Sequence, residues 1–477
     1  MFRKSWFWIV FVVVAIISGY YAYTYFPKAF PIVNVEITMN RDDALESAKK
    51  LSEEYNTGPE DYREVATYGS DGRFQNFVEL EAGGKKAFTE VIKSGIYSPY
   101  KWKVRHFKEE KVNEVLFTFT AKGVPYGIKE KLSEETVLEN LSQEEANILA
   151  KNEAESNWNI DFSKYKLVEE SDKKQTAGRI DYTFVYERTD EEIGEGKYRL
   201  RLVISGNKFT ELTHFVKIPE AFDRRYSEMR SANTTISQVG TFAIVILYVG
   251  FGILFGLFIL IKQRRIVFKP ALYWAIFVAV LFALAQLNEL PLRWMHYDTS
   301  TSMQTYIFQN IFSIISFLLL FIGMYLLANL TAEGFTRKAF PNRIQTWKLW
   351  SPKVGSSKEV VGRTVSAYLL VPIIFAVDVL FYYTVTTKFG WWSPSEALFN
   401  PNVLAMVFPW YSSIITSLHA GFFEETVFRA IPLGGAILIS QKYGRKKLWI
   451  TVGLIVQVII FGAGHASYPN QPAYARI

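Results

Sequence analysis

Long apolar segments constrain this chain more than any other feature of its sequence. A helix needs about 20 predominantly apolar residues to cross the hydrocarbon core of a membrane. The first apolar segment, residues 6–26, follows Arg3 and Lys4 and lacks a small-residue cleavage pattern at its end, which predicts an uncleaved signal anchor. Further spans are predicted at 239–261, 271–288, 305–330, 365–387 and 448–464.

One more apolar segment, residues 402–440, is too long for a single straight span. As one helix it would measure about 58 Å at 1.5 Å per residue, against a hydrocarbon core of roughly 30 Å. We therefore predict one long broken span. The candidate break points are Pro409, Gly421, Pro432 and the glycine pair at 434 and 435.

Charge divides the chain into an acidic block and basic flanks. Residues 27–236 hold 32 Lys and Arg against 38 Asp and Glu, and the rest of the chain holds 21 against 8. Basic residues collect at 262–265 and 337–363, which the positive-inside rule places in the cytoplasm. We expect a multi-pass protein of the cell membrane with a cytoplasmic amino terminus and the acidic block outside. The lipid bilayer is an expected partner, and nucleic acid is not.

The acidic block has the pattern of a soluble α+β domain. It contains no cysteine, so its core must hold it together without disulfides. A weak internal repeat relates residues 42–49 to 144–151 and residues 62–65 to 165–168. It predicts two modules, at about 35–135 and 136–220, each with a helix followed by half-buried antiparallel strands.

The predicted fold class is an α-helical polytopic membrane domain plus a soluble extracytoplasmic α+β domain with an internal repeat. The predicted divisions are the signal anchor 1–26, the outer domain 27–236, transmembrane helices with a basic cytoplasmic loop at 237–364, and a carboxy-terminal core at 365–477.

Four polar residues stand out in the apolar carboxy-terminal part. Glu424, Glu425 and Arg429 lie inside segment 402–440, and His465 follows the last span. Charged side chains within a membrane are costly, so they mark functional sites by default. Glu425 and Arg429 have the i, i+4 spacing of a helical ion pair. Glu424 points about 100° away and is the candidate general base, with His465 as the second catalytic group.

A plainer interpretation of these residues stays open. The glutamate pair could lie solvated at a cytoplasmic helix end while His465 caps its helix at the opposite surface. Helix packing is the expected role of His419, and a partner on a neighbouring helix is expected for Asp378. The outer-domain histidines, His106 and His214, each stand alone, and strand-surface or half-buried positions are expected for them rather than metal ligation.

The pattern Glu424-Glu425-x-x-x-Arg429, followed by Phe461-x-x-x-His465, resembles the first two motifs of the CPBP family. This family contains the CAAX proteases and bacteriocin-processing enzymes and is also called the Abi family. The resemblance covers about residues 365–470. It implies an intramembrane endopeptidase related to type II CAAX prenyl proteases, a hydrolase that acts on a peptide or a membrane-anchored protein.

The resemblance also implies roles for individual residues. Glu424 would activate water, Glu425 and Arg429 would be its structural and electrostatic partners, and His465 would be the second catalytic group. Phe461 would be a packing residue.

One family feature is missing. The third motif, His-x-x-x-Asn or similar, is not found before the last residue, Ile477. We expect either that the chain is a truncated form of a longer protein or that it lacks full activity.

A mechanism without a metal cofactor is favoured, because neither His-Glu-x-x-His nor His-x-x-Glu-His occurs. A divalent metal such as zinc, held by Glu424 and His465, is the alternative. A second function of a different class is a non-catalytic membrane receptor or scaffold with a ligand-binding outer domain. A transporter ranks third, because no inverted repeat is apparent.

Overall fold

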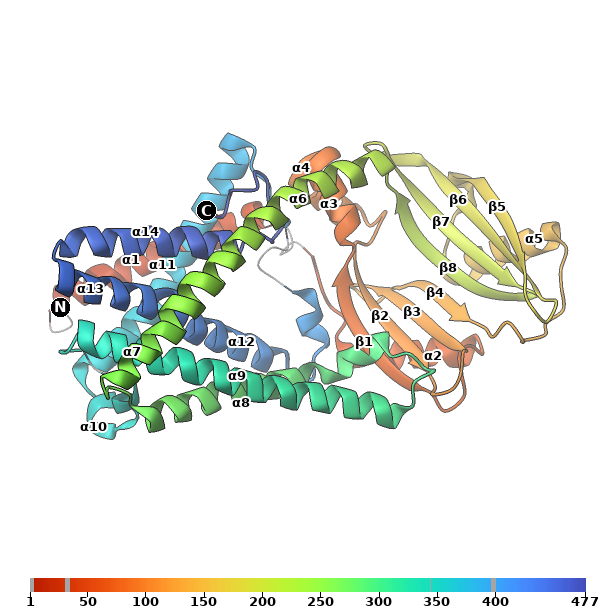
Figure 1. Cartoon of the computed structure of the whole chain (residues 1–477). Helices are drawn as coiled ribbons and strands as arrows, with labels where there is room; N and C mark the ends of the chain where they lie inside the picture. Colours follow the sequence, from red (N-terminus) through yellow and green to blue (C-terminus); the bar gives the residue numbers. More distant parts are fainter. Residues whose placement is uncertain (1–3, 31–34, 344, 396–399) are drawn as a thin grey trace.

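The computed structural model describes residues 4–30, 35–343, 345–395 and 400–477. A bundle of long helices forms one part of the molecule, and an eight-stranded sheet with its own helices forms the other (Figure 1). In the described residues, six helices are long and apolar enough to cross a membrane. They span Ser5–Ala29, Glu220–Lys262, Phe268–His296, Met303–Ala339, Lys358–Phe389 and Lys446–Gly464.

Several of these spans are built from consecutive labelled elements. They comprise α1 (Ser5–Ala29), α6 (Glu220–Ala243), the π-helical segment η3 (Ile244–Phe255), α7 (Gly256–Lys262), α8 (Phe268–Arg293), η4 (Trp294–His296), α9 (Met303–Ala339), α11 (Lys358–Phe389) and α14 (Lys446–Gly464). Between α9 and α11 lie the short helices η5 (Thr346–Trp350) and α10 (Pro352–Gly355).

The segment predicted as a long broken span is interrupted in the structure. After η6 (Pro401–Ala405), it consists of α12 (Pro409–Glu424), the π-helical turn η7 (Glu425–Ala430) and α13 (Ile431–Tyr443). Proline explains two of these boundaries. Pro409 is the first residue of α12, where its missing N–H costs nothing. Pro432 has no N–H to donate to the carbonyl four residues earlier, so the preceding turn is freed from α-helical hydrogen bonding.

Helices α1 and α11 pack along one another although they are far apart in the sequence. Ala15, Ala22 and Ala29 are the buried residues of α1, and their spacing of seven places them on one stripe. The ring of Phe26 on α1 also contacts the ring of Phe375 on α11, with centroids 6.3 Å apart. Small residues allow the two backbones to approach, as is usual for helices in membranes.

The sheet is antiparallel throughout, with the strand order β1-β2-β3-β4-β8-β7-β6-β5. Its strands are β1 (Arg63–Ser70), β2 (Tyr100–Phe107), β3 (Glu114–Thr120), β4 (Pro125–Lys131), β5 (Tyr165–Lys174), β6 (Ile180–Ile193), β7 (Gly196–Ser205) and β8 (Lys208–Lys217). Each group of four strands follows a helix, α2 (Arg41–Glu54) before β1 and α5 (Gln143–Trp158) before β5. A short helix, η2 (Phe162–Lys164), leads into β5.

Both helices cover the same face of the sheet and belong to one apolar core. Ala44 and Ala48 of α2 and Ala146 and Ala150 of α5 are fully buried. Alanine at i and i+4 gives each helix a flat side that can lie close to the aromatic side chains of the strands. The first half differs from the second by an insertion between β1 and β2, which consists of α3 (Gly72–Glu81) and α4 (Gly84–Ser94).

The other face of the sheet contacts the bundle at its β1–β2 end. Arg105 on β2 donates from one guanidinium nitrogen to the carbonyl oxygens of Trp294, Met295 and Tyr297 at 2.8–3.2 Å. These carbonyls lie in and directly after η4, and the ring of Phe107 packs on Trp294 and Tyr297 beside them. The domain is thus held to the bundle by directional hydrogen bonds as well as by apolar contacts.

The basic segments lie at the end of the bundle that is remote from the sheet (Figure 1). The start of α1, the end of α7, helix α10 and the turn between α13 and α14 are all found there. Six apolar helices are compatible with a multi-pass membrane protein. The side of the membrane on which each end lies stays a prediction.

Candidate functional site

The first motif lies where α12 passes into the π-helical turn η7. Glu424 is the last residue of α12 and is half-buried. Glu425 and Arg429 both belong to η7 and form an ion pair. Their side chains are 58 % and 60 % exposed on the protein, so in a membrane they face lipid or a water-filled space rather than neighbouring helices. Each charge neutralises the other in a setting where a lone charge would be costly.

The second motif ends at His465, directly after α14. The ring atom Nδ1 lies 2.7 Å from the carbonyl oxygen of Phe461. A carbonyl can only accept, so Nδ1 carries the proton and a neutral ring presents Nε2 as an acceptor. The ring of His465 lies 4.3 Å from that of Phe461, which fixes its orientation.

The two motif helices pack side by side in antiparallel directions. Gly453 of α14 faces Ala436 of α13, since a Cβ atom on the glycine would lie 3.0 Å from the alanine Cβ. Eight residues further along both helices, the rings of Phe428 and Phe461 meet edge to face at 5.2 Å. Four more residues in the same register lead to Glu424 and His465. Glu424 and His465 are therefore each about one helical turn beyond the Phe428–Phe461 contact.

No direct bond joins these two residues. Across the described ranges, no hydrogen bond or ion pair links Glu424 to His465. The structure thus brings Glu425 and Arg429 into contact, and it shows no contact between Glu424 and His465 among the described residues.

A third helix, formed by α6 and η3, covers this pair. Tyr248 packs on Phe428 with ring centroids 5.4 Å apart. Gly240 approaches α14 so closely that a Cβ atom there would lie 2.6 Å from the backbone of Ala463. The close approach of α6 to α14 just before His465 therefore requires a glycine at position 240, which the sequence analysis did not single out.

The other polar residues of the bundle have different environments. His419 stacks on Phe282 at 4.4 Å, next to Phe321 and Tyr325, which agrees with a role in helix packing. Asp378 lies on α11, and in the described part of the chain no hydrogen bond or ion pair reaches it. The expected partner on a neighbouring helix is thus not found among those residues.

The metal alternative is not supported by a ready-made ligand set. Within the described residues, no three His, Asp or Glu side chains gather closely enough to hold a metal ion. Glu424 and His465 would supply two ligands, whereas catalytic zinc sites use three protein ligands.

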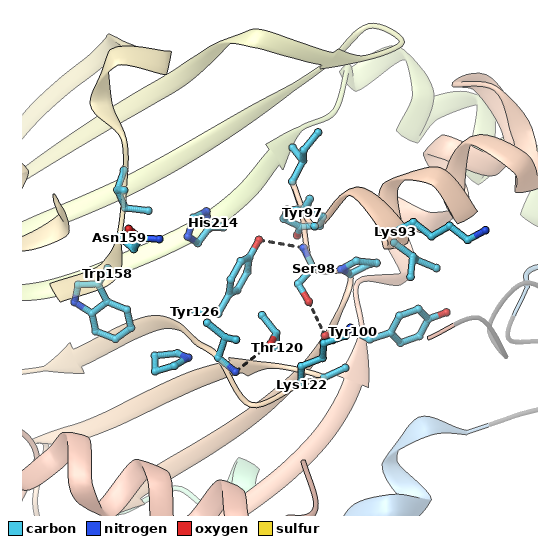
Figure 2. Close-up of a pocket in the computed structure, with 18 of the residues that line it drawn as sticks. Lys93, Tyr97, Ser98, Tyr100, Thr120, Lys122, Tyr126, Trp158, Asn159 and His214 are labelled. Carbon is cyan, nitrogen blue, oxygen red and sulfur yellow. Dashed lines mark hydrogen bonds between the residues drawn. The ribbon is translucent and has the colours of Figure 1, made fainter. Parts of the chain in front are cut away.

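The sheet domain has two features that sequence reasoning missed. One is a hollow of 710 Å³ on its helix-covered face (Figure 2). The other is Glu79 on α3, a carboxylate only 6 % exposed. It accepts hydrogen bonds from Trp392 Nε1 at 2.9 Å and from the Ser395 amide at 3.2 Å, both in the connection between α11 and α12.

Comparisons with known proteins give no assignment. No family model, no curated protein and no solved structure matches this chain.

Proposed function

We propose that this protein is an intramembrane endopeptidase of the CPBP type, which hydrolyses a peptide or a membrane-anchored protein with a water activated by Glu424. The observation that carries the proposal is the register of α13 and α14. The Phe428–Phe461 contact lies one helical turn from Glu424 and from His465, in a bundle whose helices suit a membrane, and this supports the proposal that the two groups act on one substrate.

The chemistry follows from the donor and acceptor state of each group. Glu424 accepts a proton from water, and the resulting hydroxide attacks the carbonyl carbon of the peptide bond. With Nδ1–H bonded to the Phe461 carbonyl, Nε2 of His465 is free to accept from Glu424 the proton taken from water and to pass it to the amine nitrogen as the C–N bond breaks. Once protonated, Nε2 also donates toward the developing oxyanion.

Glu425 and Arg429 act as a neutral pair in this proposal. Because Glu425 is bound to Arg429, the negative charge at the start of η7 is compensated. Glu424 is left as the carboxylate that reacts with water.

In this proposal, the sheet domain lies on the extracytoplasmic side of the cell membrane. Its two halves are copies of one module. Two features support the repeat. The helices α2 and α5 both begin with a capping box, formed by Asn40 with Asp43 and by Ser142 with Glu145. Both then lead into four antiparallel strands.

The test is replacement of Glu424 by Gln, which keeps the shape of the side chain and removes its basicity. Membranes from cells that produce the parent or the variant are compared by mass spectrometry of newly formed peptide termini. We expect at least a 100-fold loss of the parent-specific termini, since general-base catalysis contributes about 10²–10⁴-fold. The matched control is Glu359→Gln, which alters an exposed carboxylate on α11 and should leave the termini unchanged.

Thermal unfolding of the purified variants separates catalysis from structure. If Glu424→Gln cleaves as the parent does, the proposal is wrong. If it loses cleavage and also unfolds at a much lower temperature, the residue holds helices together, as the receptor or scaffold hypothesis requires.

A further inference from the structure

Helix α6 contacts the chain on both sides of His465. Figure 1 shows α6 passing from the sheet domain to the bundle across α14. On the amino-terminal side of His465, Gly240 of α6 lies against the backbone of Ala463. On the carboxy-terminal side, two polar side chains of α6 donate hydrogen bonds to backbone carbonyls of the segment 467–470. One helix therefore supports both ends of the turn that carries the proposed catalytic imidazole.

The two donors are Asn233 and Arg230, and they form one network. Asn233 is fully buried. Its Nδ2 donates to the carbonyl oxygen of Asn470 at 3.2 Å, and its Oδ1 accepts a hydrogen bond from Nη1 of Arg230 at 3.2 Å. Nη2 of Arg230 donates to the carbonyl oxygen of Ser467. A buried amide is costly unless it is paired, so a buried asparagine with both ends paired fixes these groups in one arrangement.

The segment held by α6 is in turn ordered against His465. The amide of Tyr468 donates to the carbonyl oxygen of His465 at 3.3 Å, and the two rings lie nearly parallel, with centroids 6.3 Å apart. Nδ2 of Asn470 donates to the carbonyl oxygen of Tyr468 at 3.0 Å. A displacement of residues 467–470 would therefore be transmitted to the backbone of His465, and with it to the bond between Nδ1 and the Phe461 carbonyl.

Helix α6 is itself held at both ends. It is a continuous α-helix from Glu220 to Ala243. Its first turn is fixed to helix α3 of the sheet domain, where Arg73 donates two hydrogen bonds to Asp223 at 2.9 and 2.6 Å. Its other end packs on α14 through Gly240. Groups that orient a catalytic residue act best from rigid elements whose own side chains are held by packing and hydrogen bonds.

We propose that Asn233, together with Arg230, is a positioning residue for His465. Through the backbone of residues 467–470, the two side chains hold the His465 ring with its proton on Nδ1, so that Nε2 stays available for proton transfer. The inference rests on the proposed function, which gives His465 its catalytic role. A small misplacement of a catalytic group can cost about 100-fold in rate, so the loss of this network should reduce cleavage.

The experiment replaces Asn233 by Asp, in the full chain in lipid nanodiscs. The aspartate has the same shape and keeps an acceptor for Arg230, but as a carboxylate it cannot donate to the Asn470 carbonyl. Arg230→Met is a second variant, which keeps the length of the side chain and loses the bond to Ser467. The matched control is Thr235→Val, at an exposed position of α6 two residues further on.

The readout is the set of ring-nitrogen signals of the histidines, because the chain has only five. Protein labelled with ¹⁵N in its histidine rings is compared by NMR, and His465→Gln identifies the signals of His465. In the parent we expect a neutral His465 ring with the proton on Nδ1. In Asn233→Asp and Arg230→Met we expect a second set of signals for this ring, with the proton on Nε2, while the other four histidines stay unchanged. Glu424-dependent cleavage should fall at least about tenfold in both variants. Thr235→Val should match the parent throughout.

The outcomes separate this inference from the proposed protease. Unchanged His465 signals in both variants would overturn the positioning role, even if the parent shows Glu424-dependent cleavage. Changes at all five histidine rings would make the network a general structural support and would overturn the positioning role as well. A selective change at His465, with no Glu424-dependent cleavage by the parent, would support the positioning of the ring and overturn the protease.

Discussion

His106 is a buried neutral histidine, and this makes the sheet domain sensitive to acid. The side chain is fully buried and stacks on Tyr62 at 3.9 Å. Burial lowers the pKa of His106 to about 4, and burial also lowers the pKa of His214, to about 3. Glu64 lies 3.7 Å from His106, but burial raises the pKa of this carboxyl as well, which weakens its support for a charged ring. Both histidines are thus neutral in the folded domain at neutral pH.

The pH dependence follows from the difference between the folded and unfolded chain. An unfolded histidine takes up its proton near pH 6.5, while folded His106 does so only near pH 4. The unfolded state therefore binds more protons as pH falls from 6.5 to 4, and the free energy of unfolding drops by about 3 kcal/mol for His106 alone.

We predict that His106→Phe, which keeps a ring stacked on Tyr62, makes the fall in melting temperature between pH 7 and pH 4 smaller than in the parent. His296→Phe, at an exposed histidine, is the control. An unchanged pH profile for His106→Phe would contradict the prediction.

At the scale of elements, the wide turn η7 sets how Glu424 is oriented relative to α13. Proline costs about 3 kcal/mol in a helix interior, so Pro432→Ala should let the segment relax toward a regular α-helix. We predict an unchanged or higher melting temperature together with at least a tenfold loss of Glu424-dependent cleavage, because a changed turn alters the orientation of Glu424 relative to α13. Pro409→Ala is the control, since the first turn of a helix tolerates proline. Full cleavage by Pro432→Ala would show that the turn does not orient the site.

What the sequence predicted depends on how local each feature is. The long spans follow from hydropathy summed over about 20 residues, and the Glu425–Arg429 pair follows from i, i+4 spacing. The α3–α4 insertion is two short amphipathic pieces that no long pattern marks. The short ladder between β4 and β8 depends on which strands pair across the halves, and Glu79 meets Trp392 across 313 residues of sequence. Such contacts become visible only once the chain is folded.

At the scale of the whole molecule, the absence of cysteine allows a direct test of orientation. Single cysteines can be placed at Lys111, in the sheet domain, and at Lys353, in α10 at the opposite end. We predict that a membrane-impermeant maleimide labels Lys111→Cys in intact cells but labels Lys353→Cys only after permeabilisation, as the positive-inside rule requires. The cysteine-free parent controls for background labelling. The reverse pattern would place the sheet domain in the cytoplasm.

Glu79 couples the sheet domain to the segment that follows His465. Its carboxylate accepts hydrogen bonds from Trp392 and Ser395, and the backbone of Trp392 pairs with that of Gln471. Burial raises the pKa of Glu79, opposed by nearby Lys85 and by these donors. A chain of contacts thus runs from α3, through the connection between α11 and α12, to the residues beyond α14.

Removal of this carboxylate should therefore also change the hydrogen exchange of residues beyond α14. Glu79→Ala leaves buried donors without an acceptor, at about 1–3 kcal/mol each, so we predict a clearly lower melting temperature and faster amide hydrogen exchange in residues 466–471. The control is Glu81→Ala on the same helix, which breaks an exposed ion pair with Arg225 and should cost less than about 1 kcal/mol. If both variants exchange alike in 466–471, Glu79 does not couple the sheet domain to this segment. If only Glu79→Ala exchanges faster, movement of the sheet domain can reach the residues next to His465 without any contact between the domain and His465 itself.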